Sequence, residues 1–133
     1  MGALVDTSVL IAAERGLLDL DALLTAHGDE PVAMSAITAS ELLHGVHRLK
    51  SAVGRAHAQL TIERLIATLP VVPFDLEIAR VHATLSADLR SRGTAVGAHD
   101  LIIAATAVSM GFYVATRDLR SFPKIRELAV HSW

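Results

Sequence analysis

Short apolar runs alternate with longer amphipathic segments along the chain of 133 residues. The short runs are typical of buried strands and cover residues 3–5, 31–35, 70–74 and 112–116, with residues 128–132 as a further candidate. The longer runs repeat their apolar residues at helical spacing and cover residues 7–16, 18–28, 37–49, 54–69, 76–93 and 98–111. Strands separated by one or two helices predict an α/β fold: a mainly parallel central sheet of four to five short strands, flanked by helices on both faces.

Two helical segments carry more detailed predictions. In residues 54–69, Leu60, Leu65, Ile66 and Leu69 fall on related faces, which we expect to turn toward the core. The segment 98–111 is apolar almost all round after Asp100, so this helix should lie in the middle of the molecule.

Length and composition predict one domain over residues 1–133, since no Gly/Ser-rich or Pro-rich linker divides the chain. The uncharged run 101–116 is shorter than the roughly 20 apolar residues of a spanning helix, so we expect no membrane association. The chain has no cysteine, which excludes disulfides and thiolate zinc sites and fits a reducing compartment. The first residues lack a basic region and Asp6 interrupts their apolar stretch, so we expect no signal peptide and a cytoplasmic protein.

Acidic residues stand where ligands bind in parallel sheets, outside the carboxyl ends of the strands. Asp6 follows the first predicted strand, and Asp118 follows the fourth. Glu41 lies in the helix after the second strand, and Asp100 opens the apolar helix. We therefore expect the four carboxylates to meet at one edge of the sheet.

Each acid also has a purely structural interpretation as a helix cap. Asp6 precedes a helix beginning at Thr7 or Ser8, and "TASE", residues 38–41, matches a capping box in which Glu41 reaches back to the helix start. Asp100 and Asp118 also stand at predicted helix or turn starts. One alternative is therefore a non-catalytic α/β interaction module whose acids are all caps.

Taken together, the acids favour a metal site, because crowded carboxylates repel one another unless a cation lies between them. Mg²⁺ and Mn²⁺ take oxygen ligands and are commonly held by one or two carboxylates plus substrate phosphates. Such a set favours metal-assisted attack on a phosphodiester. A net charge of −2 restricts any affinity for nucleic acid to a local patch.

Other chemistries fit less well. An aspartyl-phosphate phosphatase requires a second Asp where Ser8 stands, and the Lys124 that a receiver domain would use lies outside the strand pattern. The Glu41 to His44 spacing matches half of a di-iron site, but no second Glu-x-x-His accompanies it. The chain contains no H-E-x-x-H, no G-x-S-x-G and no Gly-rich phosphate loop.

A few basic residues are candidates for contact with RNA. Arg48, Lys50 and Arg55 gather between two predicted helices, either as a phosphate-binding patch or as a solvated turn. His99 adjoins Asp100 and is a candidate for touching a substrate.

The sequence resembles a PIN domain, specifically the VapC/FitB-like ribonuclease toxins of bacterial toxin–antitoxin pairs. The resemblance extends over the whole chain and is carried by "LVDTSVLI", "SAITASELLHG", "GAHDLIIAATA" and "VATRDLRSFPKI". By this resemblance Asp6, Glu41, Asp100 and Asp118 match the family's four acidic positions, and Thr116 matches a polar residue that accompanies the last acid.

The resemblance implies an Mg²⁺- or Mn²⁺-dependent endoribonuclease that hydrolyses RNA with a metal-activated water. It implies a homodimer and a cognate antitoxin whose C-terminal segment fills the active-site groove. Within it we expect Asp6 and Asp100 to be direct metal ligands. Glu41 and Asp118 would bind through water, hold a second ion or orient the nucleophile, and Thr116 would contact the substrate.

Overall fold

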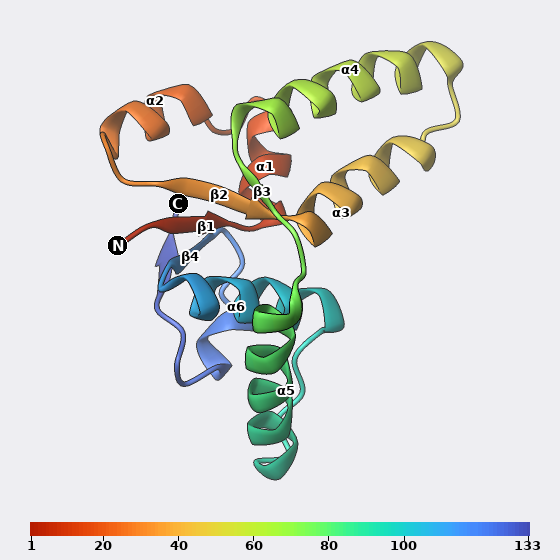
Figure 1. Cartoon of the computed structure of the whole chain (residues 1–133). Coiled ribbons are helices and arrows are strands. Elements are labelled where there is room, and N and C mark those ends of the chain that lie inside the picture. Colours follow the sequence, from red (N-terminus) through yellow and green to blue (C-terminus); the bar gives the residue numbers. More distant parts are fainter.

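A five-stranded parallel sheet forms the centre of the molecule in a computed structural model that describes all residues from 1 to 133 (Figure 1). The strand order is β3-β2-β1-β4-β5, and every neighbouring pair is parallel. The strands are β1 (Ala3–Val5), β2 (Val32–Ser35), β3 (Val71–Val72), β4 (Tyr113–Thr116) and β5 (Val130–Ser132). The predicted α/β fold is therefore confirmed, including the fifth strand.

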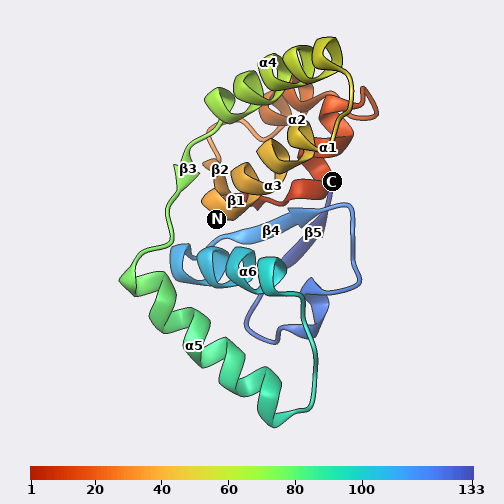
Figure 2. The ribbon, with the colours of Figure 1, turned by 90° about the vertical axis from the view of Figure 1, so that its right-hand side faces the viewer.

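Helices cover both faces of this sheet. They are α1 (Thr7–Glu14), α2 (Leu20–Ala26), α3 (Ala36–His47), α4 (Ala52–Thr68), α5 (Leu76–Ser91) and α6 (Ala98–Met110), with a short 3₁₀ turn at Phe122–Lys124. Helices α1 to α4 lie on one side of the sheet and α5 and α6 on the other (Figures 1 and 2). None of the helices combines the length and apolarity that crossing a membrane requires.

The alternation of side chains along the strands divides the core into two layers. Leu4 and Val114 face the cluster built on α5 and α6, whereas Val5 and Met34 face the cluster built on α1 to α4. Helix α6 packs its buried alanines against the sheet, so its predicted central position is confirmed.

Two details of the sequence prediction are wrong. The strand expected over 70–74 contains only Val71–Val72, since Pro70 and Pro73 have no N–H to give to a ladder. In α4, Leu60 is 52% exposed and does not face the core, whereas the predicted Leu65, Ile66 and Leu69 pack in the core cluster together with Ile62.

Candidate active site

Asp6 connects the end of β1 to the start of α1 and to the end of β4. As the N-cap of α1, its Oδ1 accepts hydrogen bonds from the Ser8 N–H at 3.0 Å and the Ser8 hydroxyl at 2.6 Å. Its Oδ2 accepts a hydrogen bond from the Thr116 hydroxyl at 2.8 Å. The residue is only 5% exposed, and this burial raises the pKa of its carboxyl. The predicted cap is therefore real, but it uses only one of the two carboxylate oxygens.

Thr116 joins two of the acids. Its side chain is fully buried, and its Oγ1 accepts a hydrogen bond from the Asp118 N–H at 2.9 Å while donating to Asp6. Ser8 makes a parallel link, because its hydroxyl accepts from the Arg117 N–H at 2.9 Å. Although we expected Thr116 to contact substrate, the structure places its hydroxyl behind Asp6, where it fixes the acid's orientation.

Glu41 projects from α3 toward α1 and α6. Its Oε1 accepts a hydrogen bond from the Thr7 hydroxyl at 2.8 Å, and its Oε2 lies 3.5 Å from Nδ1 of His99. Helix α3 begins after Ser35, whose hydroxyl accepts from the Ile37 N–H. The predicted capping box is therefore wrong, because Thr38 lies inside the helix and Glu41 binds another segment of the chain.

Asp100 lies in the first turn of α6, whose N-cap is Gly97 and has no side-chain cap. Partial burial raises the pKa of the Asp100 carboxyl, and the Ser121 side chain opposes this shift. The negative charges of Glu41 and Asp118 raise the pKa further, which places Asp100 near both of these acids. The interpretation of Asp100 as a helix cap is wrong.

Asp118 lies on the loop after β4 and pairs with Arg120. Its Oδ1 accepts from the Arg120 N–H at 3.1 Å and from Nε at 2.8 Å, and its Oδ2 accepts from Nη2 at 2.7 Å. These bonds lower the pKa of the Asp118 carboxyl to about 2. The Asp118 carboxylate therefore stabilises the turn over residues 118–120, and its negative charge lies at the same edge of the sheet as Asp6.

The four acids come from four separate segments and reach the carboxyl edge of the sheet, as their positions in the sequence predict. No three acidic or histidine side chains converge closely enough to form a ready-made metal cage, because their oxygens are turned toward hydroxyls, His99 and Arg120. Mg²⁺ needs only one or two protein carboxylates and keeps several waters. The donor set, carboxylates and hydroxyls without sulfur, therefore fits a hard divalent ion.

Sequence reasoning missed some of the residues that organise this edge. Thr7 and Ser8 supply the hydroxyls that hold Glu41 and Asp6, and Arg120 pairs with Asp118. The signal for the first two is visible in "DTS", where two hydroxyl residues directly follow an acid at a strand end. No pattern in the sequence distinguishes Arg120 from the neighbouring Arg117.

The structure separates the three basic residues proposed for RNA contact. Arg48 lines a hollow of about 410 Å³ together with Glu41, His44 and His99. Arg55 donates from Nη1 to the carbonyl oxygens of residues 49 and 50, both at 2.9 Å, and so holds the turn between α3 and α4. Lys50 is exposed and forms no ion pair. Of the three, only Arg48 lines a hollow with one of the four acids, Glu41.

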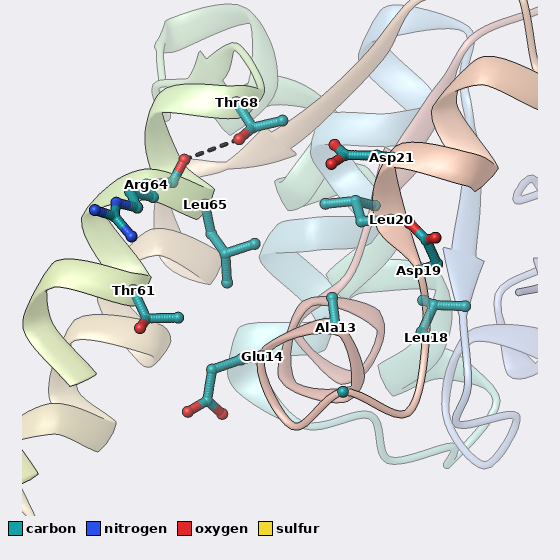
Figure 3. A pocket seen from close by; sticks show the side chains of 11 residues that line it. Ala13, Glu14, Leu18, Asp19, Leu20, Asp21, Thr61, Arg64, Leu65 and Thr68 are labelled. Carbon is teal, nitrogen blue, oxygen red and sulfur yellow. Dashed lines mark hydrogen bonds between the residues drawn. The ribbon is translucent and has the colours of Figure 1, made fainter. Parts of the chain in front are cut away.

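This hollow is one of three that lie along α1, which we together call the α1 groove. A second hollow of about 510 Å³ between α1, α3 and α4 shares Ile11, Glu41 and Arg48 with the first. A third, also of about 510 Å³, shares Glu14 with the second. Figure 3 shows this third hollow, with α4 on one side and the start of α2 on the other. The α1 groove thus comprises three hollows, the first beside Glu41 and the third beside α2.

Comparison with known proteins identifies the family to which the chain belongs. The model of the PIN domain matches residues 3–128. The chain belongs to the PIN domain family. This PIN domain is 35% identical over 130 residues to the protein named ribonuclease VapC of Rickettsia bellii, an alignment that covers 98% of the chain and 95% of that relative. The resemblance seen in the sequence motifs is thus confirmed.

Solved structures agree with the PIN domain fold. The crystal structure of VapBC2 from Rickettsia felis, bound to a DNA fragment from its promoter, matches with a TM-score of 0.90 at 22% identity. That match covers 100% of this PIN domain and 99% of the neighbouring chain. VapBC-5 from Mycobacterium tuberculosis, a member of the VapBC family of toxin–antitoxin systems, matches with a TM-score of 0.73 at 32% identity, covering 98% and 95% of the two chains.

Proposed function

We propose that this PIN domain is an Mg²⁺- or Mn²⁺-dependent endoribonuclease that acts as the toxin of a toxin–antitoxin pair. The observation that carries the proposal is that hydroxyls after β1 and at the end of β4 hold three of the acids: Thr7 bonds Glu41, and Thr116 bonds both Asp6 and the Asp118 N–H. The relationship to a protein named ribonuclease VapC supports the same chemistry.

Asp6 and Asp100 are the residues that would hold the ion directly, with Glu41 and Asp118 binding through water or holding a second ion. When bound, the ion supplies a Lewis acid for the phosphodiester and lowers the pKa of a bound water. Asp6 suits this role because Thr116 and Ser8 fix its carboxylate in a buried position. No side chain forms a covalent intermediate in this scheme.

The surrounding residues position the water and the RNA. Glu41 keeps a carboxylate beside the acids and orients the attacking water, while Thr7 holds one of its oxygens. The His99 side chain is 55% exposed next to Glu41, so it is available to an RNA phosphate. Arg48 lies in the same hollow and offers a guanidinium to the RNA backbone.

The α1 groove is the proposed binding site of the antitoxin's C-terminal segment. Its middle section has an apolar floor of Leu42, Val46 and Ile62, which suits the apolar face of an amphipathic peptide. One end opens at Glu41 and the other at Asp19 and Asp21, so basic residues flanking the apolar face would find carboxylates at both ends. We also propose that the toxin is a homodimer, as the family resemblance implies.

The alternative, an interaction module whose acids only cap helices, is not favoured. Asp6 and Asp118 accept capping bonds, but Glu41 and Asp100 cap nothing. Two of the four acids therefore do not fit the capping interpretation.

RNA cleavage tests the proposal. The purified chain is incubated with total RNA in Mg²⁺, in Mn²⁺ and in EDTA, beside Asp100→Asn and a control, Asp29→Asn, which removes an exposed acid that has no hydrogen bond or ion pair. We expect cleavage by the wild type and Asp29→Asn only when metal is present, and none by Asp100→Asn. Equal cleavage by all three proteins, or cleavage unaffected by EDTA, would contradict the proposal.

A further inference from the structure

We propose that Arg120 is an exchangeable counter-ion of Asp118: its guanidinium holds the carboxylate in the metal-free chain and releases it when a divalent ion binds. This inference rests on the proposed function, because it concerns the same acidic edge. It identifies a side chain of this protein, Arg120, as a competitor that lowers the affinity of the site for the metal ion.

The geometry of the pair leaves Asp118 fully engaged. The guanidinium contacts both carboxylate oxygens, through Nε at 2.8 Å and Nη2 at 2.7 Å, and the Arg120 N–H adds a third hydrogen bond at 3.1 Å. A carboxylate held by this fork presents few free lone pairs to another cation. Asp118 must therefore give up its side-chain bonds to Arg120 before it can contribute fully to an ion.

The Arg120 side chain is held only by Asp118 and is otherwise exposed to solvent. It is 88% exposed and makes no hydrogen bond or ion pair except with Asp118. Arg92 offers a contrast, because it pairs with Asp88 and also donates to the Lys124 carbonyl oxygen at 3.0 Å, so it is anchored at two points. Exposed pairs of this kind contribute little free energy, which a divalent ion readily exceeds.

The guanidinium occupies both carboxylate oxygens of Asp118, which are the atoms that a divalent ion would use. Two cations in that region repel each other, so binding of the ion and retention of the Arg120 fork oppose one another.

Calorimetric titration with Mn²⁺ tests the exchange. The samples are the wild type, Arg120→Gln and a control, Arg126→Gln, which removes the same charge from an exposed position without a carboxylate partner. We expect Arg120→Gln to bind Mn²⁺ about two- to fivefold more tightly, the range typical of an exposed ion pair, and Arg126→Gln to match the wild type. In an Asp118→Asn background, Arg120→Gln should have no effect on Mn²⁺ affinity.

The outcomes separate this inference from the proposed function. If the wild type binds Mn²⁺ and Arg120→Gln binds it equally or more weakly, the counter-ion exchange is wrong while the metal site stands. An equal gain in Arg126→Gln would also contradict the exchange, because it would reflect net charge alone. If none of the proteins binds Mn²⁺, both the inference and the metal dependence of the proposed nuclease fail.

Discussion

The Thr116 hydroxyl donates a 2.8 Å hydrogen bond to Asp6, joining the end of β4 to the end of β1 across 110 residues of sequence. Because β1 and β4 are neighbouring parallel strands, this bond ties an acid of the site to the central sheet. The orientation of Asp6 is therefore a property of the sheet and does not depend on a loop.

Replacing Thr116 by Val tests this link. Valine fills the same buried volume but leaves Asp6 without one donor and the Asp118 N–H without its acceptor. We expect the free energy of unfolding to fall by about 1 to 3 kcal/mol, measured by urea denaturation, and RNA cleavage to decrease. Thr116→Ser keeps the hydroxyl and should lie close to the wild type in both measurements; equal losses in the two variants would point to packing instead.

Asp100→Asn should stabilise the protein at pH 7 while abolishing cleavage. The folded chain binds the Asp100 proton more tightly than the unfolded chain, whose carboxyl has a pKa near 3.8. The contribution of Asp100 to the free energy of unfolding therefore falls as pH rises above 3.8 through the folded pKa. We expect a gain of up to about 1 kcal/mol at pH 7, because Asn removes a charge that is partly buried and lies near like charges.

Urea denaturation of Asp100→Asn and the wild type at pH 7 and near pH 3.5 measures how the difference in their free energies of unfolding changes with pH. The advantage of Asp100→Asn should shrink at the lower pH, where most of the wild-type carboxyl is protonated in both states. An advantage that grows toward low pH would mean that ionised Asp100 is stabilised in the fold.

Arg48 and Lys50 should differ in their effect on RNA binding. Arg48 lies in the hollow with Glu41 and His99, whereas Lys50 is exposed outside it. In the inactive Asp100→Asn background, we expect Arg48→Gln to weaken RNA binding and to reduce the slope of log affinity against log salt by about 0.7. Fluorescence anisotropy with a labelled single-stranded RNA measures this slope, and Lys50→Gln serves as the charge-matched control. Identical slopes for the two variants would refute the assignment of Arg48.

Leu49 lines the middle of the α1 groove and is 42% exposed, so an acid placed there should spare the fold. We expect Leu49→Asp to weaken inhibition by the cognate antitoxin by at least about tenfold, because a charge would face the peptide's apolar side. Leu60 is 52% exposed on α4 and lines none of the three hollows, which makes Leu60→Asp the matched control. Titration of antitoxin into the cleavage reaction compares them; unchanged inhibition of Leu49→Asp would place the antitoxin elsewhere.

Much of the fold follows from periodicity alone. Residues 98–111 are apolar on nearly all sides, which only a central helix can bury, and α6 occupies that position. The prediction for α4 was less accurate, because both Leu60 and Ile62 are apolar and only packing against α1 and α3 selects Ile62 for the core. Pro70 and Pro73 limit β3 through missing donors, a signal that was present in the sequence.

The placement of the acids after strand ends and in the neighbouring helices was predictable, whereas their hydrogen-bond partners were not. The position of Asp6 at a strand end follows from the order of elements, but its bond to Thr116 depends on the register of β1 against β4. The pattern "TASE" predicts a capping box only if Thr38 is the N-cap of α3. In the structure the N-cap is Ser35, three residues earlier, so Thr38 and Glu41 lie inside the helix. The Arg120 fork depends on the conformation of a loop, which side-chain periodicity does not encode.

Calorimetric titration of Mn²⁺ into the wild type and Asp6→Asn tests most directly whether the acids share an ion. Asparagine is also a good N-cap, so Asp6→Asn should keep α1 in place while losing the charge of the carboxylate. We expect saturable Mn²⁺ binding by the wild type and none by Asp6→Asn, with unchanged circular dichroism. Equal binding by both proteins, or no binding by the wild type, would contradict a metal site at this edge.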